Sequence, residues 1–288
     1  MRLGARQKGI AFIILSAFFF AAMNMFVKLS GDLPTFQKVF FRNAIAAVIA
    51  LIILIKNKSP IRPKSRHTLP FLILRTVCGL LGVICNYYAL DRLVLADASI
   101  LNKMAPFFAV IFSFFLMKER PRLYQWLTIG GAFFGALLVI KPSFGNLSLM
   151  PSLIGFLSGM FAGAAYACVR RLGTMGENNS YIVFFFSAAS TVVVAPVFLL
   201  SYEPMTWLQL TYLLCAGGCA ALAQFAVTAA YTCAPAKEIS VYDFSQILFA
   251  SLLGFVVFSE LPDMLSVIGY IVIVSMAILN DIVARRIS

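Results

Sequence analysis

The chain has 288 residues, of which 61% are hydrophobic and 12% are charged, and its formal net charge is +12. Soluble domains average about 45–50% apolar and about 25% charged residues, and a soluble core of this size could not bury the excess. Disordered chains are poor in apolar residues and are excluded for that reason. The composition therefore predicts an integral membrane protein.

A membrane-spanning helix needs about 20 mostly apolar residues. Ten stretches of the chain meet this requirement, and the segments between them are too short for a separate soluble domain. The predicted helices cover residues 10–28, 34–55, 69–90, 94–117, 123–140, 151–170, 181–200, 206–230, 236–258 and 264–282.

The lysines and arginines cluster in the short segments between the apolar stretches, where they encode membrane orientation. If the chain starts in the cytoplasm, sixteen of them fall on the cytoplasmic side and four on the other side. We therefore expect a multi-pass protein of a bacterial inner (plasma) membrane with both termini in the cytoplasm. This distribution explains the positive charge without a nucleic-acid partner.

The second half of the chain repeats the first. At a shift of 141 residues, Glu119 aligns with Glu260, and Asn102 aligns with Asp243. Because a repeat of five helices crosses the membrane an odd number of times, its second copy enters upside down. We predict two inverted five-helix repeats, residues 1–145 and 146–288, around a central cavity, an arrangement typical of secondary transporters.

Short motifs in the first half resemble the EamA-type drug/metabolite transporter superfamily. They are Tyr87-Tyr88-Ala89-Leu90, Ala96-Asp97-Ala98-Ser99, Pro106-Phe107-Phe108, Lys118-Glu119-Arg120 and Gln125-Trp126. Phe41-Arg42-Asn43, and Leu74-Arg75-Thr76 with Gly79 one turn later, are similar to the solute carrier 35 group G members. The resemblance implies a ten-helix metabolite transporter. It places the chain near a branch associated with organic-anion transport, whose bacterial relatives carry amino acids or S-adenosylmethionine.

Four charged side chains lie deep inside predicted membrane helices, away from the helix ends, where a charge is costly and marks a candidate functional site. Arg42, Arg75 and Lys103 are cationic, and Asp243 is the comparably deep acid. Three cations against one anion favour a negatively charged ligand. The alternative is that the two arginines reach the helix ends and stabilise them there.

Polar residues at helical spacing predict the faces that surround the cavity. Arg75, Gly79, Gly82 and Asn86 form one such stripe, because they recur every three or four residues. The predicted substrate-binding residues are Asn24, Arg42, Arg75, Asn86, Ser99, Asn102, Lys103, Tyr166, Gln224, Tyr231, Tyr242, Asp243 and Gln246.

The aligned positions of the two halves predict a polarised cavity. Arg42 aligns with Phe186, Arg75 with Ala216, and Lys103 with Phe244, so the second half lacks equivalent buried cations. We expect an electropositive wall from the helices at 34–55, 69–90 and 94–117. The apolar or ring part of the substrate is expected against Tyr231, Tyr242 and Phe244.

The sequence contains no phosphate-binding loop, paired catalytic carboxylates or metal-ligand cluster. It therefore predicts a transporter that is not an enzyme and needs no cofactor or metal, with a small-molecule substrate and the lipid bilayer as partners, as a monomer or homodimer. We expect alternating-access transport of a small polar metabolite, anionic or zwitterionic, such as an organic acid or amino-acid-like molecule.

Two other functions stay open at this point. One is proton-coupled export of amino acids or drugs, with Asp243 as the titrating group. If Lys103 lies close to Asp243, this acid would instead be a permanent counter-ion. The other function is that of an intramembrane enzyme or lipid-handling protein.

Overall fold

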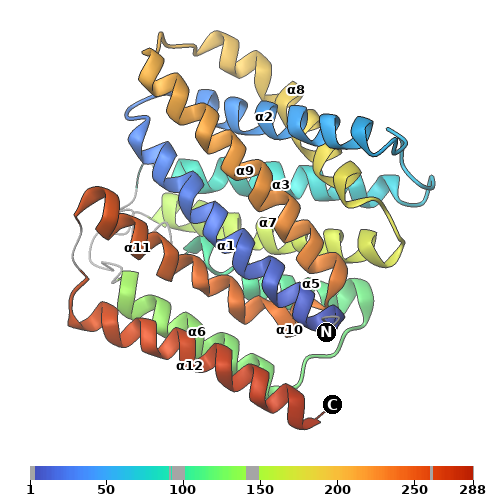
Figure 1. The fold of residues 1–288 in the computed structure, drawn as a ribbon, viewed down its shortest axis with the longest axis vertical. Coiled ribbons are helices and arrows are strands. Elements are labelled where there is room, and N and C mark those ends of the chain that lie inside the picture. The colour runs from blue at the N-terminus through green and yellow to red at the C-terminus, as the bar shows by residue number, and fades with distance from the viewer. Residues whose placement is uncertain (1–3, 91, 93–100, 141–148, 260–261, 288) are drawn as a thin grey trace.

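The computed structural model of the chain is a bundle of helices and describes residues 4–90, 92, 101–140, 149–259 and 262–287 (Figure 1). In chain order the elements are α1 (Ala5–Leu29), α2 (Thr35–Lys56), α3 (Leu69–Leu90), α5 (Ala105–Met117), α6 (Leu123–Ile140), α7 (Leu149–Thr174), α8 (Asn179–Leu200), α9 (Trp207–Cys233), α10 (Ala236–Ile239), η2 (Ser240–Phe244, a 3-10 helix), α11 (Ser245–Phe258) and α12 (Met264–Ile287).

Eight spans within the described residues are long and apolar enough to cross a membrane. They are α1, α2, α3, α7, α8, α9, the run from α10 through α11, and α12. Ala105–Met117 and Leu123–Val139 are shorter apolar helices. The prediction of an all-α membrane protein is confirmed. Residues 94–100, at the start of the predicted helix 94–117, lie outside the described residues.

The outer faces of the bundle carry large apolar side chains. Val192, Val256 and Leu200 are 72%, 68% and 91% exposed. A soluble protein rarely exposes such contiguous apolar surface. These faces are suited to contact lipid tails.

Local sequence signals explain where several helices begin. The Asn178 side chain accepts hydrogen bonds from the backbone N–H groups of Ser180 and Tyr181, which caps the start of α8. Thr206 and Gln209 form a capping box at the start of α9. Side-chain acceptors of this kind satisfy N–H groups that the first turn of a helix leaves without partners.

The predicted helix 236–258 is interrupted, which corrects the expectation of a continuous α-helix. Residues Ser240–Phe244 form a 3-10 helix between α10 and α11. Since a 3-10 helix has about three residues per turn, the break changes which side chains share a face.

Helices far apart in the sequence pack together. In Figure 1, α6 and α12 run side by side at one edge of the bundle, and α1 packs against α9. Likewise, α3 packs on α7, and α2 packs on α8. Glycine permits the close approach of α6 and α12: a Cβ on Gly135 would lie 2.9 Å from the main-chain oxygen of Gly269.

The cation-rich connections gather at one end of the bundle. The start of α1 and the end of α12 lie at this end, and Arg6 pairs with Asp281 at 2.7 Å (Figure 1). Here Glu177, after α7, accepts a hydrogen bond from the backbone N–H of Lys64, which lies between α2 and α3. The bundle therefore has a cationic end, defined by these connections, and an opposite end formed by the α1–α2 and α8–α9 connections.

Candidate functional site

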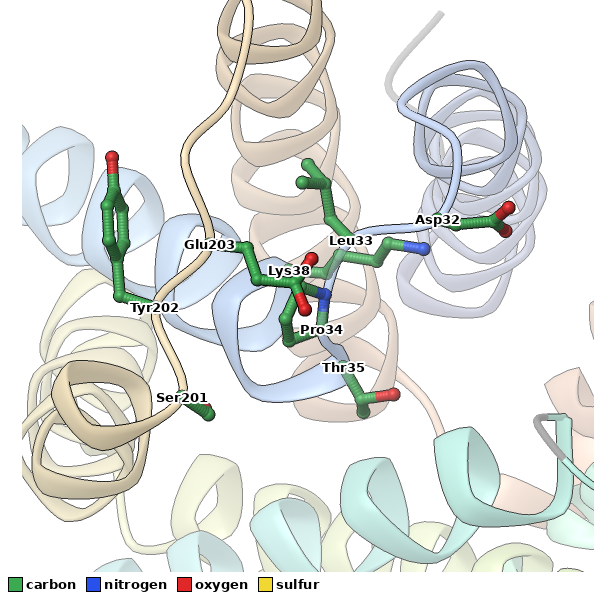
Figure 2. Close-up of a pocket in the computed structure, with 8 residues that line it drawn as sticks. All are labelled: Asp32, Leu33, Pro34, Thr35, Lys38, Ser201, Tyr202 and Glu203. Carbon is green, nitrogen blue, oxygen red and sulfur yellow. The ribbon is translucent and has the colours of Figure 1, made fainter.

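A wide hollow of about 700 Å³ lies at the opposite end. Figure 2 shows the α1–α2 connection and the segment after α8 on either side of it. Beside it, the Gln37 side chain donates to the main-chain oxygen of Glu203 and accepts from the backbone N–H of Glu203, both at 3.0 Å. This double hydrogen bond joins the two connections. None of the predicted substrate-binding residues that the structure describes lines the hollow.

A second cavity, of about 120 Å³, lies between the helices. Its lining comes from α1, α2, α3, the turn before α5, the start of α5, α7, α8, α9, η2 and α11. Ten of the predicted residues line it: Asn24, Arg42, Arg75, Asn86, Asn102, Lys103, Tyr166, Gln224, Asp243 and Gln246. Ser99 lies outside the described residues.

Arg75 on α3 is held by uncharged groups. It is 2% exposed, and its Nη2 donates to Oε1 of Gln224 on α9 at 2.8 Å. Its guanidinium carbon lies 3.6 Å from the ring centroid of Phe186 on α8, a cation–π contact. Because neither partner carries a negative charge, the positive charge of Arg75 is not neutralised by them.

Gly79, one turn after Arg75, leaves room for this arrangement. A Cβ at this position would lie 2.5 Å from Nη1 of Arg75 and 2.8 Å from Cε2 of Phe186. Both distances are shorter than van der Waals contact. The absence of a side chain at Gly79 therefore lets the guanidinium lie over the ring.

Lys103 is neutralised where Arg75 is not. Its Nζ lies 3.2 Å from Oδ2 of Asp243 and 2.7 Å from Oε1 of Gln246. The side chains of Lys103 and Asp243 are each 10% exposed. The pair joins the segment before α5 to η2, so its two members come from different halves of the chain.

Arg42 on α2 adds a further cation and is 6% exposed. Among the described residues, Nε of Arg42 and Nε of Arg75 have no hydrogen-bond partner. Of the charged residues that line the cavity, three are cationic and one, Asp243, is anionic. The described lining therefore carries an excess of positive charge, located at Arg42 and Arg75.

The amide residues mark two other parts of the cavity. Asn102 donates to the hydroxyl oxygen of Ser158 on α7 at 3.2 Å, and Ser158 donates to the main-chain oxygen of Gly155. Asn24 lines the cavity close to the end of α1 and is exposed. Asn86 lines it close to the end of α3. The cavity thus extends toward the end of the bundle opposite the cationic end.

The aromatic part of the lining differs from the prediction. Tyr242 and Phe244 do not line the cavity, because in the 3-10 helix η2 each neighbour of Asp243 points about 120° away from it. Phe244 is fully buried and packs near Phe133 of α6. Tyr231 lies behind the lining and stacks on Tyr166, with ring centroids 4.9 Å apart.

Three aromatic lining residues were not among the predicted ones. They are Phe20, Tyr87 and Phe186. Phe186 aligns with Arg42 in the sequence repeat, and this alignment is the signal that could have identified it. In an apolar helix, a phenylalanine that faces a cavity has the same sequence pattern as one that faces lipid.

A largely buried ion pair lies at the cationic end of the bundle. Nε of Arg170, at the end of α7, lies 2.9 Å from Oε1 of Glu119, which follows α5. Nη1 of Arg170 also donates to the main-chain oxygen of Thr232 on α9. Both side chains of the pair are largely buried, at 14% and 13% exposure. This contact joins three helices at the end that the cavity does not approach.

Among the described residues, no three His, Cys, Asp or Glu side chains are grouped as metal ligands. Within the part of the chain that the structure describes, the lining supplies instead two arginines with no acidic partner, a neutral amide network and several aromatic rings. Such a lining can bind an anion by charge-assisted hydrogen bonds and hold an apolar group beside it.

Comparison with known proteins decides the family. Residues 7–141 match the EamA-like transporter family. The pseudopaline exporter CntI of Pseudomonas aeruginosa is 35% identical over 279 residues, covering 95% of this chain and 96% of its own length. The chain belongs to the EamA-like transporter family. The resemblance drawn from the sequence motifs is therefore confirmed.

Two further relatives widen this family comparison. Human solute carrier family 35 member G1 is 26% identical and covers 93% of this chain and 77% of its own length. The S-adenosylmethionine uptake transporter of Rickettsia felis is 22% identical, and the match covers 92% of this chain and 90% of the relative's own length. This EamA-family chain is accordingly a membrane transporter protein and not an enzyme.

A solved crystal structure shares the fold. It matches this EamA-family chain with a TM-score of 0.84 and 16% sequence identity, and the match covers 97% of this chain and 98% of the other. At this identity the match shows the fold alone.

Proposed function

We propose that the chain is a secondary transporter that carries a small anionic or zwitterionic metabolite through the central cavity. The observation that carries this proposal is the buried guanidinium of Arg75, whose partners among the described residues, Gln224 and Phe186, are both uncharged. A carboxylate can form two parallel hydrogen bonds with a guanidinium. The substrate class is therefore an organic acid or an amino-acid-like molecule.

We propose that Arg42 contributes to the same subsite, while Lys103 acts through its pair with Asp243. An unpaired buried donor costs about 1–3 kcal/mol, which an acceptor on the ligand would offset. Tyr166 and Phe186 offer ring faces to the apolar part of a substrate. Asp243 is a counter-ion to Lys103 in this account, so proton-coupled export through Asp243 is the less favoured function.

Ten membrane helices in two inverted repeats are the proposed architecture. One support is local geometry: Lys118 and Ser259, 141 residues apart, both end a helix in the left-handed conformation, with φ of 57° and 56°. Helix packing is a second support. The first helix of one half packs on the third of the other in both directions, as α1 with α9 and α7 with α3.

Alternating access is the proposed mechanism. Ligand pockets for drug-sized molecules measure about 300–1,000 Å³, so a cavity of about 120 Å³ has to widen before it takes a substrate. The cavity approaches one end of the bundle, and the Arg170–Glu119 pair at the other end is the proposed gate. Opening this pair while the opposite end closes would pass the substrate across the membrane.

The proposed location is a bacterial inner membrane, with the cationic end in the cytoplasm according to the positive-inside rule. The relatives named as a pseudopaline exporter and an S-adenosylmethionine uptake transporter both carry small molecules, in opposite directions. They support a small-molecule cargo for this chain and leave its direction to experiment.

Purified protein in proteoliposomes tests the substrate class. A panel of radiolabelled organic acids, amino acids and organic cations is offered with and without a pH gradient. We expect saturable transport of an anionic or zwitterionic solute by the wild type, and its loss in Arg75→Ala. Empty liposomes and the Arg285→Ala variant, altered at an exposed position, are the controls. Transport of a cation that is unchanged in Arg75→Ala would contradict the proposal.

Cysteine labelling tests the inverted arrangement. In a background without native cysteines, Asp263→Cys should react with an impermeant maleimide added outside cells, whereas Arg122→Cys should react only after the membrane is opened. The physical reason is that an inverted repeat places the two aligned connections on opposite sides. Labelling of both variants from the same side would contradict the ten-helix topology.

A further inference from the structure

Three oxygen atoms converge on the ammonium nitrogen of Lys103. Oε1 of Gln246 lies 2.7 Å from it, Oδ2 of Asp243 lies 3.2 Å away, and the main-chain oxygen of Asp243 lies 3.4 Å away. We call these three atoms the oxygen cage. One of them carries negative charge, and the surroundings are buried, so the cage has the chemistry of a site for a monovalent cation.

The cage belongs to one short segment of the chain. Asp243 lies in η2 and Gln246 lies in the first turn of α11, three residues later, and helical residues three apart lie on the same side. Interrupted membrane helices are where transporters place oxygen ligands for coupling ions. Lys103 comes from the other half of the chain, so the cage does not depend on the backbone of Lys103 for its construction.

Lys103 lies in the turn between the helical residues Leu101 and Asn102 and the start of α5. It immediately precedes Met104, the N-cap residue of α5. A helix N-terminus carries partial positive charge and disfavours a cation nearby. The ammonium group is therefore held in place by the oxygen cage rather than by the element from which it extends.

We propose that the oxygen cage is a binding site for a small monovalent cation and that the Lys103 ammonium occupies it in the wild type. The chain thus carries its own cation, and its cycle needs no sodium ion. Removal of the lysine side chain opens the cage to a soluble cation. Methylammonium is the best fit, because it reproduces the end of the lysine side chain and the hydrogen-bond distances of the cage.

Thermal melting of the purified protein tests this without any knowledge of the substrate. Lys103→Ala is melted in methylammonium chloride, sodium chloride and N-methylglucamine chloride at equal ionic strength. In the bulky N-methylglucamine salt we expect a melting temperature about 5 °C or more below that of the wild type, because the charge of Asp243 is unpaired. Methylammonium should raise the melting temperature of Lys103→Ala back toward that of the wild type in a saturable manner. Sodium should raise it by a smaller amount.

Two matched proteins control this measurement. The wild type should melt at the same temperature in all three salts, since Lys103 fills the cage. The double variant Lys103→Ala/Asp243→Asn should not respond to methylammonium, because the cage has lost its negative charge. If Lys103→Ala unfolds during purification, size-exclusion profiles of membranes solubilised in each salt give the same comparison.

Transport gives a second readout, and this part rests on the proposed function. Wild-type flux of the anionic substrate should be equal in sodium and N-methylglucamine buffers. Flux by Lys103→Ala should fall about tenfold in N-methylglucamine, as for a loss of 1.4 kcal/mol, and should recover in methylammonium. If no anion is transported by the wild type, the proposed function fails while the melting result still stands.

Two outcomes would overturn the cation site. One is a folded Lys103→Ala protein whose melting temperature is indifferent to methylammonium and sodium at concentrations up to hundreds of millimolar. The other is a wild type that needs sodium for stability or flux. Restoration of melting in the single variant and its absence in the double variant would establish the site.

Discussion

Two buried cations in the same cavity have opposite surroundings. Lys103 lies beside Asp243, so its charge is cancelled within the protein. Arg75 lies against Gln224 and Phe186, which hold its guanidinium without cancelling its charge. The sequence presents both as buried cations of the first half. The difference shows that the partner of a buried charge, rather than its depth, decides whether the charge is available to a ligand.

The comparison also separates two functions within one site. Neutral partners fix the position of Arg75 and leave its electrostatic field for an anion, as expected for a binding group. The Lys103–Asp243 pair joins the two halves and sits at a helix break, as expected for a group that holds the halves together. Variants that alter one partner at a time should therefore affect stability at one cation and affinity at the other.

Breaking the Lys103–Asp243 pair should have the largest effect. Asp243→Ala leaves the Lys103 ammonium buried without its counter-ion, and such a change costs about 3–5 kcal/mol of stability. We expect a lower melting temperature of the purified protein. The double variant Lys103→Met/Asp243→Asn removes both charges and should regain most of the loss. A double variant no more stable than Asp243→Ala would show that the ion pair is not the cause.

Removing the available cation should weaken binding instead. Arg75→Ala takes away a charge-assisted contact worth about 1.5–3 kcal/mol, which corresponds to about 10- to 150-fold in affinity. Isothermal titration of the transported solute measures this, and Arg75→Lys should retain part of the affinity because it keeps the charge. Membrane insertion should be unchanged. An affinity equal to that of the wild type would mean that Arg75 has a structural role and does not bind the substrate.

The ring that positions Arg75 should matter less. Phe186→Leu keeps an apolar side chain but loses the cation–π contact, which is worth about 0.5–2 kcal/mol. We expect a few-fold weaker binding of an anionic solute, measured by isothermal titration. Phe133→Leu, a ring that does not line the cavity, is the matched control. Equal losses in both variants would indicate general repacking.

An exposed ion pair sets the lower limit of these effects. Arg285 pairs with Asp281 at 2.7 Å on α12, but its side chain is 69% exposed. Pairs of this kind contribute about 0.3–0.5 kcal/mol, and salt screens them. Arg285→Ala should therefore leave melting temperature and flux within experimental scatter. A large loss of melting temperature or flux would mean that the exposure of an ion pair does not indicate its contribution to the stability of this protein.

The sequence predicted the helical membrane architecture closely but predicted the site only in part. Apolar length alone placed the predicted helix 34–55 within one residue of the Thr35–Lys56 helix. The break in 236–258 was not predicted, because that stretch contains no proline and its one glycine, Gly254, lies well after η2. In the structure, Tyr242 and Phe244 do not line the cavity.

Side-chain pairing was the other part that the sequence could not decide. Lys103 and Asp243 are 140 residues apart, and only the packing of the two halves shows that they meet. Phe186 carries no polar signal, yet it lies directly under the guanidinium of Arg75. Charge type and helical spacing identify which residues are candidates, while long-range packing determines which charges remain available.

Discrimination between a carboxylate and its amide tests the central claim most directly. The transported solute and its neutral primary amide are titrated into the wild type and into Arg75→Ala under identical conditions. We predict that the wild type binds the carboxylate at least about tenfold more tightly than the amide, and that Arg75→Ala binds the two nearly equally. Unchanged discrimination in Arg75→Ala would show that Arg75 does not select the charge of the substrate.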